Sequence, residues 1–112
     1  MKIKKGYVCI ADLNPRIGTE PGKVRPVVVV QTDLLNGIHP STIICPITTQ
    51  VQPKARFLRV HLKAGEGGLQ KLSDILVDQI RAVDNQRLLS IMGKISSKSL
   101  KHLMDNIHTV LA

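Results

Sequence analysis

The chain has 112 residues, which is enough for one hydrophobic core and too few for two domains. Hydrophobic residues make up 43% of it, as in globular proteins, and no apolar run approaches the roughly 20 residues of a membrane-spanning helix. Sixteen Lys and Arg against eight Asp and Glu leave a formal charge of +8, which favours a polyanion or an acidic protein as partner. We therefore expect one domain over residues 1–112, soluble and cytoplasmic, with no membrane partner.

Most of the predicted elements are β-strands. Segments rich in Val, Ile and Leu are bounded by Gly, Pro, Asn or Ser, which is typical of short strands separated by turns. The first of them, in MKIKKGYVCIADL, does not have the pattern of a cleavable signal. Asn85 to Leu89 and Thr32 to Asn36 fit short helical turns. In chain order the predicted strands cover residues 6–13, 26–31, 42–48, 57–62, 74–83 and 90–94.

One long helix is predicted at the end of the chain. Leu100, Leu103 and Ile107 follow helical spacing, and Ser96 or Ser97 is available as the N-cap, so we expect the helix over about 97–111. A flat sheet of this size would leave one face uncovered. The pattern therefore predicts a mainly β protein with a small, strongly bent sheet or barrel and a C-terminal helix.

Several kinds of site are excluded or disfavoured by composition. Cys9 and Cys45 lie in apolar runs and are too few for a disulfide framework or a thiolate metal site, so we expect both to be reduced core residues. Tyr7 and Phe57 are the only aromatic residues, which excludes a multi-ring platform for stacking bases. The histidines show no HxH or HExxH spacing, and we expect surface or edge positions, no metal and no cofactor. They are His39, His61, His102 and His108.

The segment GTEPGKVRPVVVVQ joins a long loop rich in Gly and Pro to four consecutive valines. Pro26 disfavours the helical region for Arg25 and lacks an amide hydrogen, which suits the first position of a strand. In extended chain Lys23 and Arg25 point to the same side. The uninterrupted run Val27 to Val30 is typical of a strand buried on both faces. Arg25 is thus predicted at the mouth of a central strand, behind a loop of the length that often carries a binding surface.

A second segment, CPITTQ, ends an apolar run in three small polar residues. Taken alone, each segment has a local explanation: Arg25 pairs with Glu20 at the surface, and the threonines satisfy nearby backbone groups. Taken together, they supply a cation, hydroxyl groups and an amide, which suits binding of a phosphodiester. The polar residues concerned are Thr48, Thr49 and Gln50.

With VDQIRAVDNQRL ahead of a short strand and the helix, these two segments resemble the MazF/PemK/Kid toxins of bacterial toxin-antitoxin modules. The resemblance covers Gly6 to Leu111, with three motifs in the family's order. It implies a compact SH3-like β-barrel of the MazF/CcdB type that forms a homodimer. It also implies a sequence-specific, metal-independent endoribonuclease that cuts single-stranded messenger RNA and is neutralised by an acidic, MazE-like antitoxin.

The resemblance also implies roles for particular residues. The catalytic pair of the family falls on Arg25 and Thr48, and its loop carboxylate falls on Glu20, a candidate for catalysis or for orienting the substrate. RNA-contacting positions fall on Thr49, Gln50 and Asp78, and Lys23 beside the catalytic arginine is a further RNA-binding candidate. The expected reaction is attack of the RNA 2′-OH on its own phosphorus, giving a 2′,3′-cyclic phosphate or 3′-phosphate and a 5′-OH.

One position departs from the family pattern. Some relatives place a second catalytic Arg two residues before the acidic position of the DQIR segment, where this chain has Leu76. More of the chemistry therefore falls on Arg25. Arg81 follows Asp78 by three residues on the predicted strand, so we expect it on the opposite face, with a structural or interfacial role.

Three alternatives remain open at the level of sequence. The first is a gyrase poison of the CcdB type, which depends on a Trp near the C-terminus that this chain lacks. The second is an SH3-like barrel that binds nucleic acid or protein without catalysis, and the third is an inactive family member. The basic segment Pro53 to Arg59 fits a solvated charged hairpin better than a surface that follows RNA phosphates.

Overall fold

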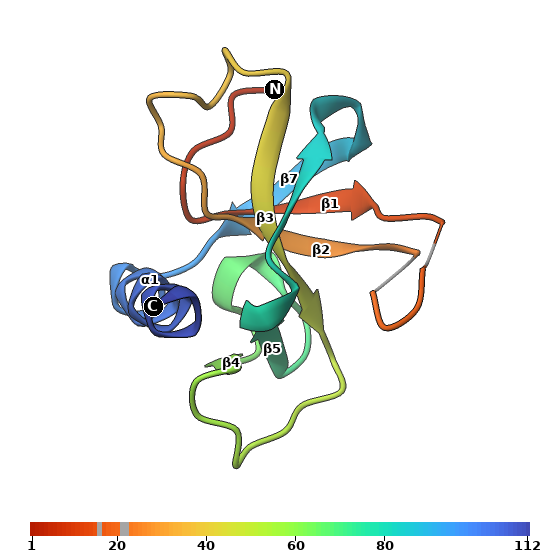
Figure 1. Ribbon diagram of the computed structural model, residues 1–112. Helices are drawn as coiled ribbons and strands as arrows, with labels where there is room; N and C mark the ends of the chain where they lie inside the picture. The colour runs from red at the N-terminus through yellow and green to blue at the C-terminus, as the bar shows by residue number, and fades with distance from the viewer. Residues whose placement is uncertain (16, 21–22) are drawn as a thin grey trace.

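The computed structural model describes residues 1–15, 17–20 and 23–112, so Pro21 and Gly22 of the predicted binding loop lie outside the described residues. In this part of the chain there are seven strands, three short 3-10 helices and one α-helix (Figure 1). The strands are β1 (Tyr7–Asp12), β2 (Val24–Val29), β3 (Ser41–Thr48), β4 (Arg59–Leu62), β5 (Ser73–Leu76), β6 (Arg81–Asp84) and β7 (Leu88–Lys94). The helices are η1 (Glu66–Gly68), η2 (Val77–Gln79), η3 (Asn85–Arg87) and α1 (Ser97–Leu111).

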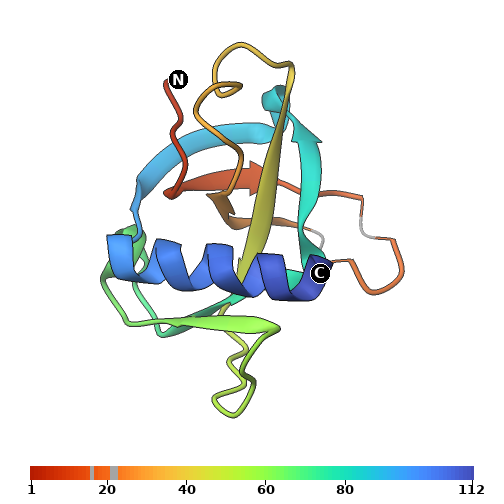
Figure 2. The same ribbon diagram turned by 60° about the vertical axis from the view of Figure 1, so that its left-hand side comes forward.

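The strands form one antiparallel, strongly bent sheet in the order β4-β5-β3-β2-β1-β7. The long strand β3 is central, because its first half pairs with β6 and its last two residues pair with β5. Figures 1 and 2 show the strands wrapping around the interior. The prediction of a mainly β, barrel-like fold with a C-terminal helix is confirmed, although the sheet path does not close on itself within the described residues.

Strand β2 is buried on both faces, as its run of valines predicts. Val28 and Val30 belong to the apolar cluster that also contains residues of α1, whereas Val27 and Val29 belong to the cluster on the other side of the sheet. Each of these clusters also contains one of the two cysteines, and both thiols are free and buried. Burial raises the pKa of Cys9 to about 11, and burial followed by the charge of Asp78 raises that of Cys45 to about 12.

Helix α1 begins where the sequence predicts. Ser96 is the N-cap, and its hydroxyl accepts a hydrogen bond from the Ser99 amide at 3.1 Å. The Ser96 amide and hydroxyl both donate to Glu66 of η1, each at 3.1 Å. Figure 2 shows α1 lying across one side of the sheet, where it packs against β4 and η2. No helix in the described residues is long and apolar enough to cross a membrane.

The predicted strand over 74–83 is wrong, because it contains two strands separated by η2. β5 pairs with the end of β3 and β6 with its beginning, so the chain must turn between them. The apolar run continues through this turn because Val77 is fully buried. Asp78 therefore lies in a 3-10 turn, and the strand alternation used to separate it from Arg81 does not apply.

Four smaller differences occur at turns and near the start of β2. Residues 32–36 form hydrogen-bonded turns, with Leu35 and Asn36 amides donating to the Thr32 carbonyl, but not a helix. The predicted turn at 85–89 is the shorter helix η3. Lys23 has a positive φ of 67°, so it is not in extended chain as predicted. Pro26 is the third residue of β2 rather than the first, at a point where β2 pairs with β1 alone and a missing amide hydrogen is tolerated.

Candidate active site

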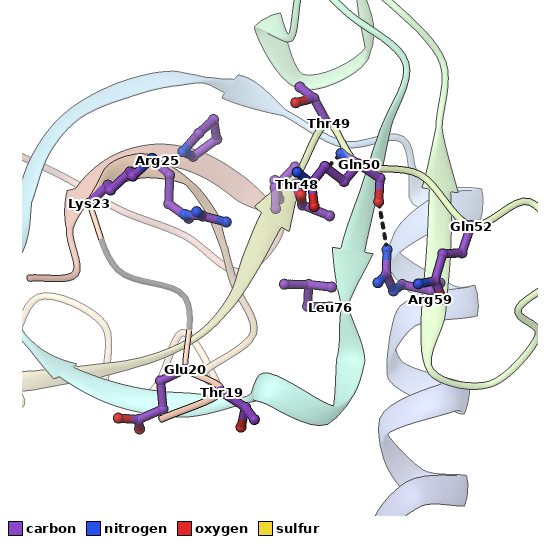
Figure 3. A pocket seen from close by; sticks show the side chains of 12 residues that line it. Thr19, Glu20, Lys23, Arg25, Thr48, Thr49, Gln50, Gln52, Arg59 and Leu76 are labelled. Atoms are coloured by element: carbon purple, nitrogen blue, oxygen red, sulfur yellow. Dashed lines mark hydrogen bonds between the residues drawn. The ribbon is translucent and has the colours of Figure 1, made fainter. Parts of the chain in front are cut away.

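The two polar segments singled out in the sequence meet at one cavity of about 540 Å³ (Figure 3). The loop before β2, the start of β2 and the end of β3 supply residues that the sequence predicted, and β4 and β5 supply others. The predicted residues that line it are Glu20, Lys23, Arg25, Thr48, Thr49 and Gln50. The additional polar ones are Thr19, Gln52 and Arg59. The sequence therefore identified one wall of the cavity and missed much of the other.

Arg25 is positioned by the backbone of β2. It lies opposite Ala11 in the β1–β2 ladder, and the fully buried Val27 follows two residues later. The side chain is partly buried, and Figure 3 shows it extending into the cavity toward the end of β3. Because strand pairing and core packing fix the backbone on which it stands, the guanidinium is presented from a rigid support.

Thr48 is the last residue of β3 and faces Asp74 of β5 in the ladder. Its hydroxyl oxygen accepts a hydrogen bond from the Gln50 amide at 3.1 Å, which holds the turn that carries Thr49 and Gln50. Both of those residues are exposed at the cavity. An oxygen that accepts this bond still has its own proton to donate, so Thr48 can contact an oxyanion while it holds the turn.

Two predicted residues lie apart from this arrangement. Glu20 is at the cavity rim, and Figure 3 shows its carboxylate pointing away from Arg25 and Thr48. Asp78 is exposed and lines an adjoining cavity of about 320 Å³ rather than the first one. Leu76 lines both cavities, so the apolar side chain noted in the sequence does stand at the site.

Arg59 is a further polar residue of the cavity, and the sequence does not predict its contacts. The basic segment Pro53 to Arg59 is predicted to be a solvated hairpin, but Arg59, which begins β4 within the predicted strand 57–62, has a side chain that is only 15% exposed. Its Nη1 donates to the Gln50 carbonyl at 3.0 Å and to Asp74 Oδ2 at 3.1 Å. The arginine thus connects β4 to the turn after β3. The signal in the sequence for this position is strand alternation, which places Arg59 next to the buried Val60 on the opposite face of β4.

Asp74 is a fully buried carboxylate behind the cavity. Its Oδ2 also accepts from the Gln52 amide at 2.8 Å, and its Oδ1 is 2.6 Å from Nδ1 of His61. Burial alone raises the pKa of Asp74, but the hydrogen bonds from Gln52, His61 and Arg59 outweigh it and lower the pKa below its ordinary value. The hydrogen bond to Asp74 raises the pKa of His61 above 6.5.

His61 lies at the edge strand β4, in agreement with the predicted edge position for histidines. Its Nε2 is 3.0 Å from the Ala55 carbonyl oxygen. Both ring nitrogens therefore face acceptors, an arrangement that favours the imidazolium because it donates at both nitrogens. Among the residues that the structure describes, no group of three or more His, Cys, Asp or Glu side chains is arranged to hold a metal ion.

The chemistry that this cavity offers is cationic and hydrogen-bonding. Lys23, Arg25 and Arg59 face it with Glu20 as the one carboxylate among its described lining residues. Arginine binds phosphate oxygens with forked, charge-assisted hydrogen bonds, and Thr48 adds a neutral donor. Such a set suits binding and charge stabilisation of a phosphodiester.

The chain as a whole is similar to known proteins. A family model described as the PemK-like, MazF-like toxin of type II toxin-antitoxin system matches residues 4–111. The chain is similar to the endoribonuclease EndoA of Bacillus subtilis, with 36% identity over 112 residues that cover 100% of this chain and 97% of that protein.

Two crystal structures from Deinococcus radiodurans show the fold. MazF (Form-I) aligns with a TM-score of 0.85 and 22% identity, over 99% of this chain and 97% of the other. The MazE-MazF complex (Form-II) aligns with a TM-score of 0.79 and 22% identity, over 99% of this chain and 96% of the other.

Proposed function

The chain belongs to the PemK-like, MazF-like toxin family of type II toxin-antitoxin systems and is an endoribonuclease toxin, and we propose that it cuts single-stranded messenger RNA at a short sequence without a metal ion. The observation that supports this proposal is the meeting of Arg25 and Thr48 at one cavity from two different strands. The CcdB-type poison and the non-catalytic barrel lose their support, because the matched family model and the relative are of the MazF type.

In the proposed reaction the 2′-oxygen bonds to the adjacent phosphorus and the bond from phosphorus to the 5′-oxygen breaks. The proton leaves the 2′-OH, and the 5′-oxygen gains one as it departs. Arg25 stabilises the negative charge that builds on the phosphoryl oxygens, and Thr48 orients the phosphate by hydrogen bonding. The products are a 2′,3′-cyclic phosphate, which can open to a 3′-phosphate, and a 5′-hydroxyl.

Proton transfer needs a group other than these two. A guanidinium holds its proton at ordinary pH and a neutral hydroxyl is a poor base. Glu20 is assigned to removal of the 2′-proton or to orientation of the ribose, with its carboxylate turned inward when RNA is bound. Glu20→Gln separates the two roles. If Glu20 is the general base, the variant loses the acidic limb of the pH–rate profile. If Glu20 orients the ribose, the variant changes KM and keeps the same profile.

The neighbouring residues are assigned to RNA binding. Lys23, Thr49 and Gln50 line the first cavity and are proposed to contact the scissile phosphate, and Asp78, which lines the adjoining cavity, is proposed to contact a nucleotide. The net charge of +8 supports association with RNA and with an acidic antitoxin. The solved complex of MazE with MazF, which has this fold, supports the antitoxin assignment. We assign a homodimer as the functional form, to be checked by light scattering.

One substitution in the RNA and the removal of metal ions test the reaction directly. An oligonucleotide that contains a mapped cut site is synthesised with 2′-deoxyribose at the scissile position only. We expect no cleavage at that bond, because the nucleophile is gone, while a second site in the same strand is cut at its usual rate. Cleavage at the deoxy position contradicts 2′-OH attack. Loss of cutting in EDTA contradicts a metal-independent reaction.

A further inference from the structure

We propose that Arg59 binds the phosphate next to the one held at Arg25, as a second phosphate-binding group of the same groove. This inference rests on the proposed action on RNA. Figure 3 shows the two arginine side chains on opposite sides of Thr48 and Leu76. Both line the cavity of about 540 Å³, so one continuous space is bounded by two guanidinium groups that come from different strands.

Arg59 also stands at the junction of two cavities. The first cavity and the adjoining one of about 320 Å³ share Arg59, Leu76, Thr19 and Gln52. A strand that passes from the scissile phosphate at Arg25 toward Asp78 therefore passes Arg59. Each nucleotide step brings one further phosphate, so a fixed cation at the junction meets the neighbouring linkage and sets the register of the strand.

The way Arg59 is held leaves part of its hydrogen-bonding capacity for a ligand. Both of its hydrogen bonds, to the Gln50 carbonyl and to Asp74, come from Nη1. Within the described ranges, Nε and Nη2 donate to no protein atom. Arginine has five N–H donors in a fixed fork, so the remaining N–H groups are oriented by the anchored one and stay available for phosphate oxygens.

The pairing with Asp74 does not cancel the positive charge of this cluster. Asp74 accepts from Arg59 at one oxygen and from His61 at the other. When both of its ring nitrogens are protonated, His61 donates to Asp74 and to the Ala55 carbonyl and is cationic, a state that its raised pKa favours. Two cations share one carboxylate, and one positive charge remains. Asp74 and His61 act as positioning residues, because neither side chain lines the cavity.

The experiment measures binding to uncut RNA, so its outcome is separate from that of the cleavage test. The probe is a cut-site oligonucleotide with 2′-deoxyribose at the scissile position, titrated from low to high salt. For Arg59→Met we expect affinity to fall roughly tenfold or more, the loss of a charged hydrogen bond. The slope of log affinity against log salt should fall by about 0.7, the value for one phosphate on a single strand. Lys98→Met, which removes an exposed cation on α1, is the matched control and should keep most of the affinity and most of the salt slope.

Replacing one phosphate of the RNA by a neutral linkage then identifies the phosphate that Arg59 contacts. Methylphosphonate placed one linkage away from the cut, on the side toward Asp78, should weaken binding to the wild type and not to Arg59→Met. Equal weakening of both proteins at every linkage overturns the proposal. A folded Arg59→Met protein with wild-type affinity and salt slope overturns it as well.

Arg59→Met leaves the buried carboxylate of Asp74 with one partner fewer, so the effect on folding needs its own control. Asp74→Asn removes that charge, and the double variant Arg59→Met with Asp74→Asn removes both. If Arg59 only stabilises the fold, Asp74→Asn and the double variant bind RNA with equal affinity and with the same salt slope. If it binds phosphate, the double variant shows the lower slope. If the wild type cuts RNA while Arg59 has no effect on binding, this inference fails and the proposed function stands.

Discussion

Nδ1 of His61 lies 2.6 Å from Oδ1 of Asp74, whose side chain has no exposed surface. The pair makes stability depend on pH in two directions. His61 has a raised pKa when folded, so its contribution is complete below about pH 6.5, its ordinary value, and is lost as the pH rises through the folded pKa. Asp74 has a lowered pKa, so its contribution is complete above about pH 4 and is lost as the pH falls through the folded pKa.

The first prediction concerns the alkaline side of this profile. We expect the melting temperature to fall as the pH rises from about 6.5 to 9, because deprotonation of His61 removes a charged partner of Asp74. In His61→Gln this decline should disappear, and the melting temperature should change little over the same range. Thermal melting followed by circular dichroism at closely spaced pH values measures both. A decline of the same size in His61→Gln assigns it to another group.

The second prediction concerns catalysis at Arg25 and Thr48. Arg25→Ala removes the cation at the scissile phosphate, and we expect cleavage to slow by about 10²–10³-fold, as when a transition-state donor is deleted. Thr48→Val removes only the hydroxyl and should slow the reaction, whereas Thr48→Ser keeps it and should retain most of the rate. Single-turnover cleavage of a short RNA measures the rates. Equal activity of Thr48→Val and Thr48→Ser contradicts a role for the hydroxyl.

The third prediction concerns the beginning of α1. Ser96 caps the helix and is also the hydrogen-bonding partner of Glu66 in η1. Ser96→Ala removes the hydroxyl, and we expect the free energy of unfolding to fall by about 1 kcal/mol, typical of a lost N-cap. Urea denaturation measures it. Ser97→Ala is the matched control at the next, exposed position, and it should change stability by less.

The fourth prediction concerns contact between β7 and η1. A Cβ built on Gly93 lies 2.8 Å from the Gly67 carbonyl carbon, which is backbone and has little room to shift. We expect Gly93→Ala to destabilise the fold by about 1–3 kcal/mol or more through overpacking. Gly65→Ala is the control: a Cβ there meets no atom within 4 Å, and only its positive φ of 95° adds strain. A Gly93→Ala protein as stable as the wild type contradicts the close approach.

Much of the fold was predictable because the relevant signals are local. Four consecutive valines marked a strand buried on both faces, and the Leu and Ile spacing with Ser96 marked the C-terminal helix. The error at 74–83 has a physical cause: an apolar run does not distinguish a continuous strand from two strands joined by a buried turn. Val77 is fully buried in either case, so its hydrophobicity carried no information about the change of direction.

The site was predictable only in part. Arg25 and Thr48 stand beside segments with clear turn and strand signals, so sequence reasoning reached them. Arg59 and Asp74 are 15 residues apart, and they meet because β4 and β5 pair in antiparallel register. That pairing is a long-range property. In the sequence Arg59 ends a segment with several basic residues, and Asp74 has no visible partner.

The residues that line the cavity differ in how freely they can be substituted, because some stand on paired strands and others on the loop before β2. Arg25, Thr48 and Arg59 are carried by paired strands, and the valines after Arg25 pack into both apolar clusters, so moving these side chains disturbs the whole fold. Thr19, Glu20 and Lys23 precede β2, and none of these three residues belongs to either cluster. With Glu20 kept, exchange of its neighbours in this loop is therefore expected to alter the target preference, while the proposed phosphate-binding groups remain on an unchanged scaffold.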